Sequence, residues 1–329
     1  MIKIMKKGLM MLGVAAIALA SCTQNEVMEV AESRAIGFDS FVGKTTKAII
    51  DDEHPLTSFQ VFGGYKDLTN NFNDVTVTES NGEWGYQDPQ YWEASKTYTF
   101  QAYAGAEATA TPTANGVTFT GFQAINNADL LASEVVSVTT DGQSKPTSGV
   151  NGEGKIDLTF RHVLSMIKFT FTSELAKNVN ITISELTVKQ LNSKGNYTLS
   201  AANTGTWSGL DTPFDYDFNT EGAFTSEASK VSDEVIVMPQ AIADKTIEVT
   251  FKVSATGGLN ITDVAHTVTL PAVTLDEGNC YNFAAKLTAE NIIDPENPLV
   301  KIEFGDPTVT PWADADGGEV NFPEPTPEP

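Results

Sequence analysis

Residues that hold metals or form disulfides are scarce in this chain of 329 residues. It contains two cysteines, Cys22 and Cys280, and three histidines, His54, His162 and His266, each isolated in the sequence. Zinc and copper sites need several such side chains close together, and a disulfide framework needs several cysteine pairs. We therefore expect no metal, no cofactor and no covalent scaffold.

Basic residues are also few, with 20 Lys and Arg against 43 Asp and Glu, which gives a net charge of −23. A nucleic-acid partner is excluded by this balance, because phosphate contacts require basic side chains. The acidic residues are spread along the chain rather than gathered in blocks. They are typical of a solvated surface that keeps an external protein soluble.

Motifs that carry catalysis are missing as well. The sequence has no Gly-x-Ser-x-Gly elbow, P-loop, His-Glu-x-x-His helix or dinucleotide fingerprint. Arg161-His162 is the one pair that suggests a proton shuttle, but a histidine satisfied at a domain boundary is the favoured interpretation. The segment Asp314 to Glu319 resembles half of a calcium loop and is interpreted as a turn, because the distal ligands are absent. The chain is not expected to be an enzyme.

No stretch shows a sustained helical period of apolar residues, whereas short alternating runs are frequent. Such alternation is typical of half-buried antiparallel strands, and the fold is predicted to be all-β. The predicted strands include 98–102, 167–172, 179–183, 247–251 and 266–270. The predicted turns are Asn81-Gly82, Asp141-Gly142, Asn151-Gly152, Lys194-Gly195-Asn196, Gly257-Gly258 and Glu277-Gly278-Asn279.

The first 21 residues form a secretory leader, with Lys3, Lys6 and Lys7 ahead of the apolar run Gly8 to Ala20. The run is too short to span a bilayer, which needs about 20 apolar residues. It ends in Leu19-Ala20-Ser21-Cys22, which resembles the bacterial lipobox. Residues 1–21 are therefore predicted to be a signal peptide, and Cys22 a lipidated residue.

Residues 22–34 then form a lipidated tether, and Thr23, in place of an aspartate, favours the cell outer membrane as the destination. Lipidation of one cysteine leaves Cys280 without a disulfide partner.

A division of the remaining chain is predicted near residue 155, because Gly, Ser, Pro and Asn replace apolar residues between Asp141 and Lys155. The predicted parts are an N-terminal β-sandwich over 35–155 and a C-terminal β-sandwich over 156–322. The tail 323–329 alternates proline with polar residues and is expected to stay extended.

Four aromatic residues, Trp84, Tyr86, Tyr91 and Trp92, lie close together in the sequence. They allow two interpretations: a stacking platform for sugars, or side chains of the core and the strand edges. The core interpretation is favoured.

Several segments, taken in order, resemble the fimbrillin family, the lipoprotein precursors of type V pili and their relatives. The segments that carry the resemblance are the lipobox, 34–41, 45–48, 59–65, Tyr91-Trp92, 129–132, 158–165, 235–240 and Pro311-Trp312.

The resemblance implies two tandem transthyretin-like antiparallel β-sandwich domains and polymerisation by donor-strand exchange after proteolysis removes a leader strand. Residues 36–42 match the leader strand. Near the other end, apolar and polar residues alternate in Val300 to Phe304 and in Val309-Thr310. These segments are interpreted in one of two ways, as the last strand of the domain or as the donor strand.

The sequence departs from the family at the cleavage point, where Thr46-Lys47-Ala48 replaces Thr-Arg-Ala. The candidate processing residues are Arg34, Lys44 and Lys47. Cleavage at Arg34 would free the protein from lipid but leave the leader strand in place, whereas cleavage at either lysine would release it.

The expected function is a structural or anchor subunit of a pilus or adhesive fibre at the cell surface. Its expected partners are like or related pilin subunits, the outer membrane through the lipid, and a host or glycan ligand. The alternative is a surface glycan-binding lipoprotein that does not polymerise.

Replacement of Cys22 by alanine should leave an unprocessed precursor that does not partition into detergent, because the thiol is the acceptor of the lipid. Fatty-acid labelling and detergent-phase partition measure this. Cys280→Ala is the matched control and should label normally. A Cys22→Ala chain that still carries labelled lipid would contradict the assignment.

Overall fold

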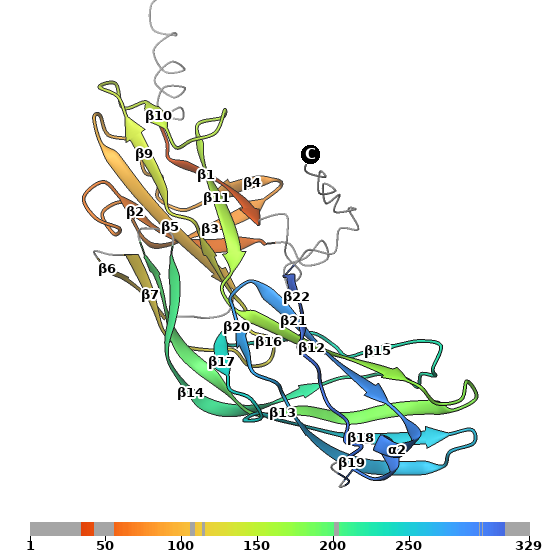
Figure 1. Cartoon of the computed structure of the whole chain (residues 1–329). Coiled ribbons are helices and arrows are strands. Elements are labelled where there is room, and N and C mark those ends of the chain that lie inside the picture. The colour runs from red at the N-terminus through yellow and green to blue at the C-terminus, as the bar shows by residue number, and fades with distance from the viewer. Residues whose placement is uncertain are drawn as a thin grey trace, which may run out of the picture.

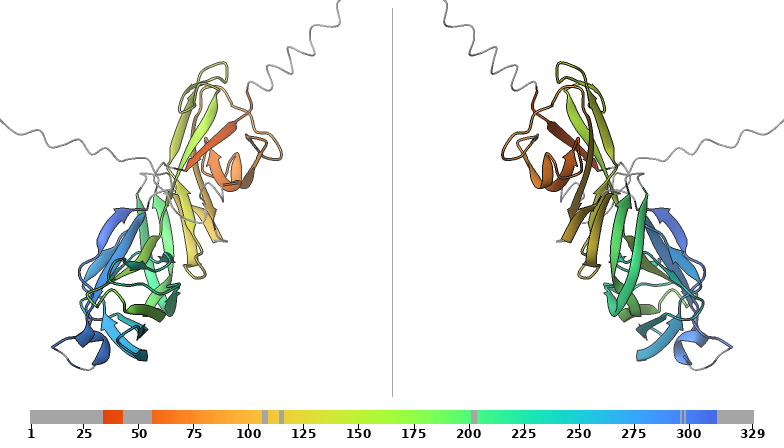
Figure 2. Two further views of the ribbon diagram at one scale, coloured as in Figure 1. Left: turned by 90° about the vertical axis from the view of Figure 1, so that its right-hand side faces the viewer. Right: turned by 90° about the vertical axis from the view of Figure 1, so that its left-hand side faces the viewer.

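The computed structural model describes residues 34–42, 56–105, 109–113, 116–200, 204–295, 297 and 299–312. Nearly all regular structure in this part of the chain is β-strand, and its single helix is α2 (Ala289–Ile293). The prediction of an all-β fold is confirmed. The strands form an elongated molecule, with the first strands at one end and α2 at the other (Figures 1 and 2).

The largest sheet has nine strands and is built from residues at the N-terminal end of the described chain. Its path is β1-β11-β8-β5-β2-β3-β4, with β9 paired to β5 and β10 paired to β9. The strands are β1 (Gly37–Val42), β2 (Ser58–Gly64), β3 (Phe72–Ser80), β4 (Glu83–Gly85), β5 (Thr97–Gly105), β8 (Leu130–Ser133), β9 (Val136–Thr140), β10 (Pro146–Ser148) and β11 (Lys155–His162).

This sheet is antiparallel except at one edge, where β1 runs parallel to β11. It curls until its two ends approach each other. Phe38 of β1 thus packs against Phe72 of β3, with ring centroids 5.2 Å apart. The concave side holds one hydrophobic core made of residues from both ends of the sheet.

Two further sheets face each other in the second half of the molecule. The five-stranded sheet contains β12 (Ser165–Ser173), β15 (Lys230–Val231), β16 (Val235–Val237), β21 (Asn279–Leu287) and β22 (Thr308–Pro311). The six-stranded sheet contains β6 (Thr109–Thr113), β7 (Gly116–Gln123), β13 (Asn180–Ser200), β14 (Gly205–Phe218), β18 (Glu248–Thr256) and β19 (Ile261–Thr269). A separate pair joins β17 (Gln240–Ile242) and β20 (Val273–Leu275).

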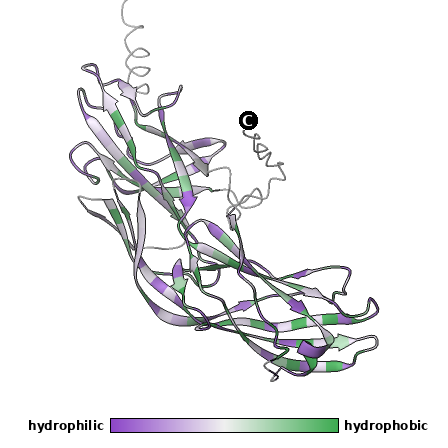
Figure 3. Ribbon diagram, in the orientation of Figure 1, coloured by the Kyte–Doolittle hydropathy of each residue, from purple (hydrophilic) through white to green (hydrophobic). Residues whose placement is uncertain are grey.

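The packing between these two sheets is that of a β-sandwich. Phe171 of β12 lies against Phe251 of β18, with ring centroids 5.3 Å apart. Phe169 of β12 lies against Phe218 of β14 at 5.0 Å. Apolar and polar residues alternate along the strands (Figure 3), so one face of each sheet enters the core and the other faces solvent.

Strand β13 is 21 residues long and runs from the sandwich to the β6–β7 hairpin. Its first part pairs with β18, and its last part pairs with β7, which precedes residue 155 in the sequence. The predicted turn Lys194-Gly195-Asn196 is wrong, because these residues lie inside β13, where only the pairing register shifts. The segment is paired on both sides, by β14 and by β7, which keeps it extended.

The chain passes from the nine-stranded sheet to the five-stranded sheet at Val163 and Leu164, between β11 and β12. By sheet membership, therefore, β11 belongs with the strands that precede it. Sheet membership does not show where one domain ends and the next begins, so the domain boundary near residue 155 stays a prediction. A third hydrophobic core lies between the other two and includes Val163, Leu164 and Tyr197.

The predicted turn at Asn81-Gly82 joins β3 to β4, as expected from its residues. Both residues have positive φ, 57° and 84°, and this conformation suits the twist of a tight hairpin. In the described part of the chain, no helix has the length and apolar character needed to cross a membrane.

Gly63 lies in β2, where an added Cβ would come within 2.3 Å of the Phe100 ring. Gly63→Ala should therefore destabilise the mature chain by about 1–3 kcal/mol, the usual cost of overpacking a core. Gly85→Ala is the matched control, since its Cβ would meet nothing within 4 Å. Urea unfolding midpoints measure both. Equal midpoints for the two variants would contradict the packing described for Phe100.

Candidate functional site at the first strand

Strand β1 and Ile36, the residue ahead of it, alternate in the way that a strand at the edge of a core requires. Ile36 and Phe38 are each 1% exposed, whereas Gly37 and Asp39 between and after them are half-buried. The apolar pair therefore faces the core of the nine-stranded sheet, and the prediction that Ile36 and Phe38 point the same way agrees with this placement.

Phe38 is surrounded by aromatic rings. Its ring centroid lies 5.2 Å from that of Phe72, 5.8 Å from Tyr86, 5.9 Å from Phe100 and 6.2 Å from Phe59. All four contacts have the edge-on geometry that aromatic pairs favour. Burial of such a side chain contributes about 1.5–3 kcal/mol before these specific contacts are counted. One residue of β1 thus joins β2, β3 and β5.

The backbone of β1 is paired along its whole length. Its partner β11 runs in register from Gly37 opposite Lys155 to Val42 opposite Phe160. Ahead of the strand, the Ile36 amide donates to the Gln90 carbonyl at 2.8 Å, and the Tyr86 hydroxyl donates to the Ile36 carbonyl at 2.7 Å.

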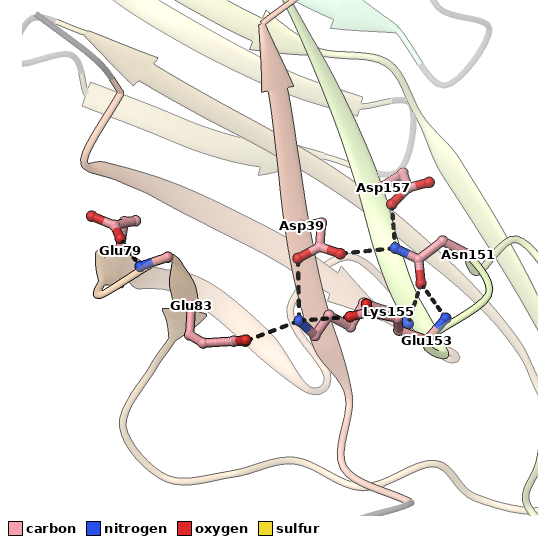
Figure 4. A network of polar contacts seen from close by, with 8 residues as sticks. Asp39, Glu79, Glu83, Asn151, Glu153, Lys155 and Asp157 are labelled. Atoms are coloured by element: carbon pink, nitrogen blue, oxygen red, sulfur yellow. Dashed lines mark hydrogen bonds and ion pairs between the residues drawn. The ribbon is translucent and has the colours of Figure 1, made fainter.

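A polar network covers the outer face of β1 (Figure 4). The Lys155 ammonium lies 3.0 Å from the Glu83 carboxylate, 3.2 Å from Glu153 and 3.4 Å from Asp39. Asn151 donates to the other Asp39 oxygen at 2.8 Å. The hydrogen bond to Glu83 is the main cause of a raised Lys155 pKa.

Surface ion pairs of this kind are each worth about 0–1 kcal/mol. The network therefore sets the position of β1 relative to β4 and β11, and the buried aromatic contacts carry most of the stability.

The C-terminal segment also enters a core. Ile302 and Phe304 are buried in the core of the sandwich, and Phe304 lies 5.1 Å from Phe169 between ring centroids. The intervening Glu303 is exposed. The segment therefore has the same two-residue apolar spacing as Ile36 and Phe38.

Strand β22 follows this segment and pairs antiparallel with β21 at the edge of the five-stranded sheet. All four of its residues are exposed, so little besides backbone pairing and the next residue holds it. That residue, Trp312, is buried and stacks on His162, with ring centroids 4.2 Å apart and planes 12° apart. Its amide donates to the Gly278 carbonyl at 2.8 Å.

His162 lies in packing rather than in an open cleft. Its Nδ1 is 2.7 Å from the Asp129 carboxylate, and both side chains are buried. The neighbouring Arg161 donates to the Tyr197 hydroxyl at 3.2 Å and pairs with Glu277 at 3.4 Å. The structure thus brings together Asp129, His162 and Trp312, three motifs that are far apart in the sequence, and it favours the structural interpretation of the histidine.

The four sequence-adjacent aromatics mostly belong to the core. Trp92 is 4% exposed and lies 4.8 Å from Tyr98 between ring centroids. Trp84 and Tyr86 are half-buried against the same core, and only Tyr91 is exposed, at 50%. They do not form a shared exposed platform.

The candidate processing residues are only partly described by the structure. Arg34 is exposed, in a turn just before β1, and its carbonyl accepts a hydrogen bond of 3.0 Å from the Trp92 amide. Cys22, Lys44 and Lys47 lie outside the described residues. The same holds for 314–319 and for the tail 323–329.

Across the described residues, no three His, Cys, Asp or Glu side chains are grouped so as to hold a metal ion. Cys280 is a buried free thiol in the third hydrophobic core, which also contains Val163, Leu164 and Tyr197.

A family model described as fimbrillin-like matches residues 46–312. Solved structures with similar folds include a fimbrial protein from Bacteroides vulgatus, with a TM-score of 0.58 and 15% identity, covering 85% of this chain and 100% of that one. Candidate cell adhesion proteins from Bacteroides uniformis and Bacteroides ovatus give TM-scores of 0.54 and 0.52 at 16% and 14% identity. They cover 85% and 86% of this chain, and 98% and 99% of their own. No curated protein matches the chain.

The matched family and the similar structures are described as fimbrial or as candidates for cell adhesion rather than as enzymes. They confirm the expectation that this chain is not an enzyme.

Burial raises the pKa of Cys280 to about 11. A thiol with this pKa is ionised in about one molecule in a thousand at pH 8, and the thiolate is the reactive form. In a Cys22→Ala chain, Cys280 should therefore react with a disulfide reagent far more slowly in buffer than in urea. Stoichiometric reaction at the urea rate in buffer alone would contradict the burial of this side chain.

Proposed function

Because the chain belongs to the fimbrillin-like family, we propose that it is a structural or anchor subunit of an adhesive surface fibre assembled by donor-strand exchange. The observation that carries this proposal is the position of β1. A strand at the very start of the described chain supplies Ile36 and Phe38 to a core that later strands otherwise build.

Loss of β1 would leave a sheet with a missing edge. The groove would be lined by Phe59, Phe72 and Phe100, and β11 would have unpaired backbone groups along the residues that now face β1. An extended segment of another subunit can satisfy both the backbone and the pockets, which is the chemistry of strand addition. The partners proposed are therefore like or related subunits.

The C-terminal segment is the proposed donor. Ile302 and Phe304 repeat the spacing of Ile36 and Phe38, and each pair is buried beside polar neighbours in its own core. Strand β22 beyond them is exposed and depends on backbone pairing with β21 and on the buried Trp312. Release of the donor would also take Ile302 and Phe304 out of the sandwich core, where Phe304 contacts three other rings. Val300 to Phe304 would then supply the apolar pair to the groove of a neighbouring subunit.

Processing decides whether the groove opens. Cleavage at Arg34 leaves β1 joined to the chain through residues 43–55 and packed in place. Cleavage at Lys44 or Lys47 cuts that connection. A chain that is cut at neither lysine keeps β1. If Arg34 is also intact, the chain keeps its lipid. Such a chain would stay anchored in the membrane with its groove closed, as the anchor subunit at the base of a fibre would.

The proposed location is the outer membrane, to which lipidated Cys22 and the tether 22–34 would anchor the protein. The proposed folding units are residues 35–155 and 156–322. The alternative function is a surface glycan-binding lipoprotein that does not polymerise, and Trp84 and Trp92 do not offer it a stacking platform because these side chains pack against the core.

The test compares cleavage by a protease specific for lysine and arginine with cleavage by an arginine-specific protease. The first enzyme should convert the wild-type chain into oligomers, because it releases β1, and the second should leave monomers. Lys47→Arg should give oligomers with the second enzyme as well. Size exclusion with N-terminal sequencing of each product measures this.

A synthetic peptide of residues 35–42, added during cleavage, should block assembly by refilling the groove. The same peptide with Phe38→Ala is the matched control and should block poorly, because it lacks the ring that contacts four others. The Lys44→Gln/Lys47→Gln chain should stay monomeric with either enzyme. Products that remain monomeric after documented loss of β1 would rule out strand exchange at this end.

A further inference from the structure

The chain has two arginines, Arg34 and Arg161, so an arginine-specific protease could cut it at two bonds. The Arg34 side chain is exposed in a turn and is open to such an enzyme. The bond that follows it is not open in the same way. Its carbonyl, that of Arg34, accepts a hydrogen bond of 3.0 Å from the Trp92 amide. At this site, therefore, an accessible side chain precedes an engaged peptide bond.

The backbone on the carboxyl side of this bond is paired as well. Ala35 forms an antiparallel bridge with Tyr91. The Ile36 amide donates to the Gln90 carbonyl at 2.8 Å. The Ile36 carbonyl accepts a hydrogen bond of 2.7 Å from the Tyr86 hydroxyl. The pairing then continues into β1, whose partner is β11. The chain is thus held by hydrogen bonds from the scissile carbonyl onward.

Two side chains close to the bond are buried. Ile36 and Phe38 are the second and fourth residues after it, and each is 1% exposed. A protease binds several residues on either side of its scissile bond as an extended, unpaired chain. Entry into its cleft would therefore require both side chains to leave the core. Susceptibility to proteolysis follows the burial and hydrogen bonding of the affected backbone, which here favour resistance.

The opposite segment, residues 90–92, is fixed by its own packing. The Trp92 ring is buried and lies 4.8 Å from Tyr98 between ring centroids. The Tyr86 hydroxyl links the two segments, because it also accepts a hydrogen bond of 3.2 Å from the Gln90 amide. The bond after Arg34 is therefore freed by undocking of the first segment rather than by a shift of its partner.

We propose that docking of residues 34–38 shields the Arg34–Ala35 bond from arginine-specific proteolysis, and that the bond is cut only when this segment opens locally. Cleavage then follows the population of the open state. The shielding goes beyond the proposed fibre function, because it needs neither cleavage at a lysine nor strand exchange. Its consequence rests on the proposed anchor: the folded chain keeps lipidated Cys22 when an arginine-specific protease is present.

The test compares the mature chain, in detergent, with a synthetic peptide of residues 30–40 that contains the same bond without the fold. An arginine-specific protease should cut the folded chain after Arg34 at least about tenfold more slowly than the peptide, because only the open fraction is a substrate. Mass spectrometry of the products that begin at Ala35 gives both rates. In urea that unfolds the chain, the chain and the peptide should be cut at similar rates.

Two conservative variants assign the resistance to these contacts. Tyr86→Phe removes the hydroxyl but keeps the ring, and Ile36→Val, measured against a peptide with the same change, removes one methyl group. Each should raise the cleavage rate of the folded chain about fivefold, the effect of one lost hydrogen bond or buried methyl group.

The matched controls are Tyr216→Phe and Ile183→Val, which make the same changes at buried positions of the sandwich. The Tyr216 hydroxyl also donates to a backbone carbonyl, that of Ala124, at 2.6 Å. Both controls should leave the cleavage rate at Arg34 unchanged. Thermal unfolding shows that each variant is folded.

A folded wild-type chain that is cut less than about tenfold more slowly than the peptide would overturn the proposal. Equal acceleration by Tyr86→Phe and Tyr216→Phe would overturn it as well, because cleavage would then follow global unfolding. The same holds if neither Tyr86→Phe nor Ile36→Val changes the rate.

Discussion

The structure of the N-terminal sheet depends on the burial of the Phe38 ring among Phe59, Phe72, Tyr86 and Phe100. This one side chain closes a curled sheet whose two ends would otherwise face each other across an open core. The closure is also remote in sequence, because Asp39 of β1 and its ion-pair partner Lys155 are 116 positions apart. A contact between residues so far apart in the sequence is expected to form slowly.

In the proposed strand exchange, the same constraint would keep the chain monomeric until processing removes β1. While β1 is present, the apolar groove and the edge of β11 are covered, so neither is exposed to aggregation. The strand is held mainly by shape and hydrophobic contact, and the Lys155 network on its outer face positions it. A donor strand that replaced β1 would need the same alternation of apolar residues but not the ion pairs with Lys155. The residues on its exposed face could therefore vary.

Many of the strands could be predicted from the sequence, because alternating apolar and polar residues indicate which face of a strand is buried. Residues 36–38 show this most clearly, with two apolar side chains separated by glycine. The long strand β13 could not be predicted in the same way. Lys194-Gly195-Asn196 has the composition of a turn, and only pairing with β7 and β14 on either side keeps it extended. Nor did spacing along the chain indicate that Asp129, His162 and Trp312 meet, since contacts between sheets depend on topology rather than on local pattern.

Strand β13 has a mechanical consequence for a protein that is pulled along its length. Its 21 residues span roughly 70 Å at the usual rise per residue, and they pair with strands that come before and after residue 155 in the sequence. A tensile load applied along β13 would be carried by its continuous backbone and by hydrogen bonds loaded in shear, many of which must break together. A flexible linker between the halves would instead extend first under the same load. The region from β18 to β7 is thus joined by one continuous strand rather than by a flexible linker.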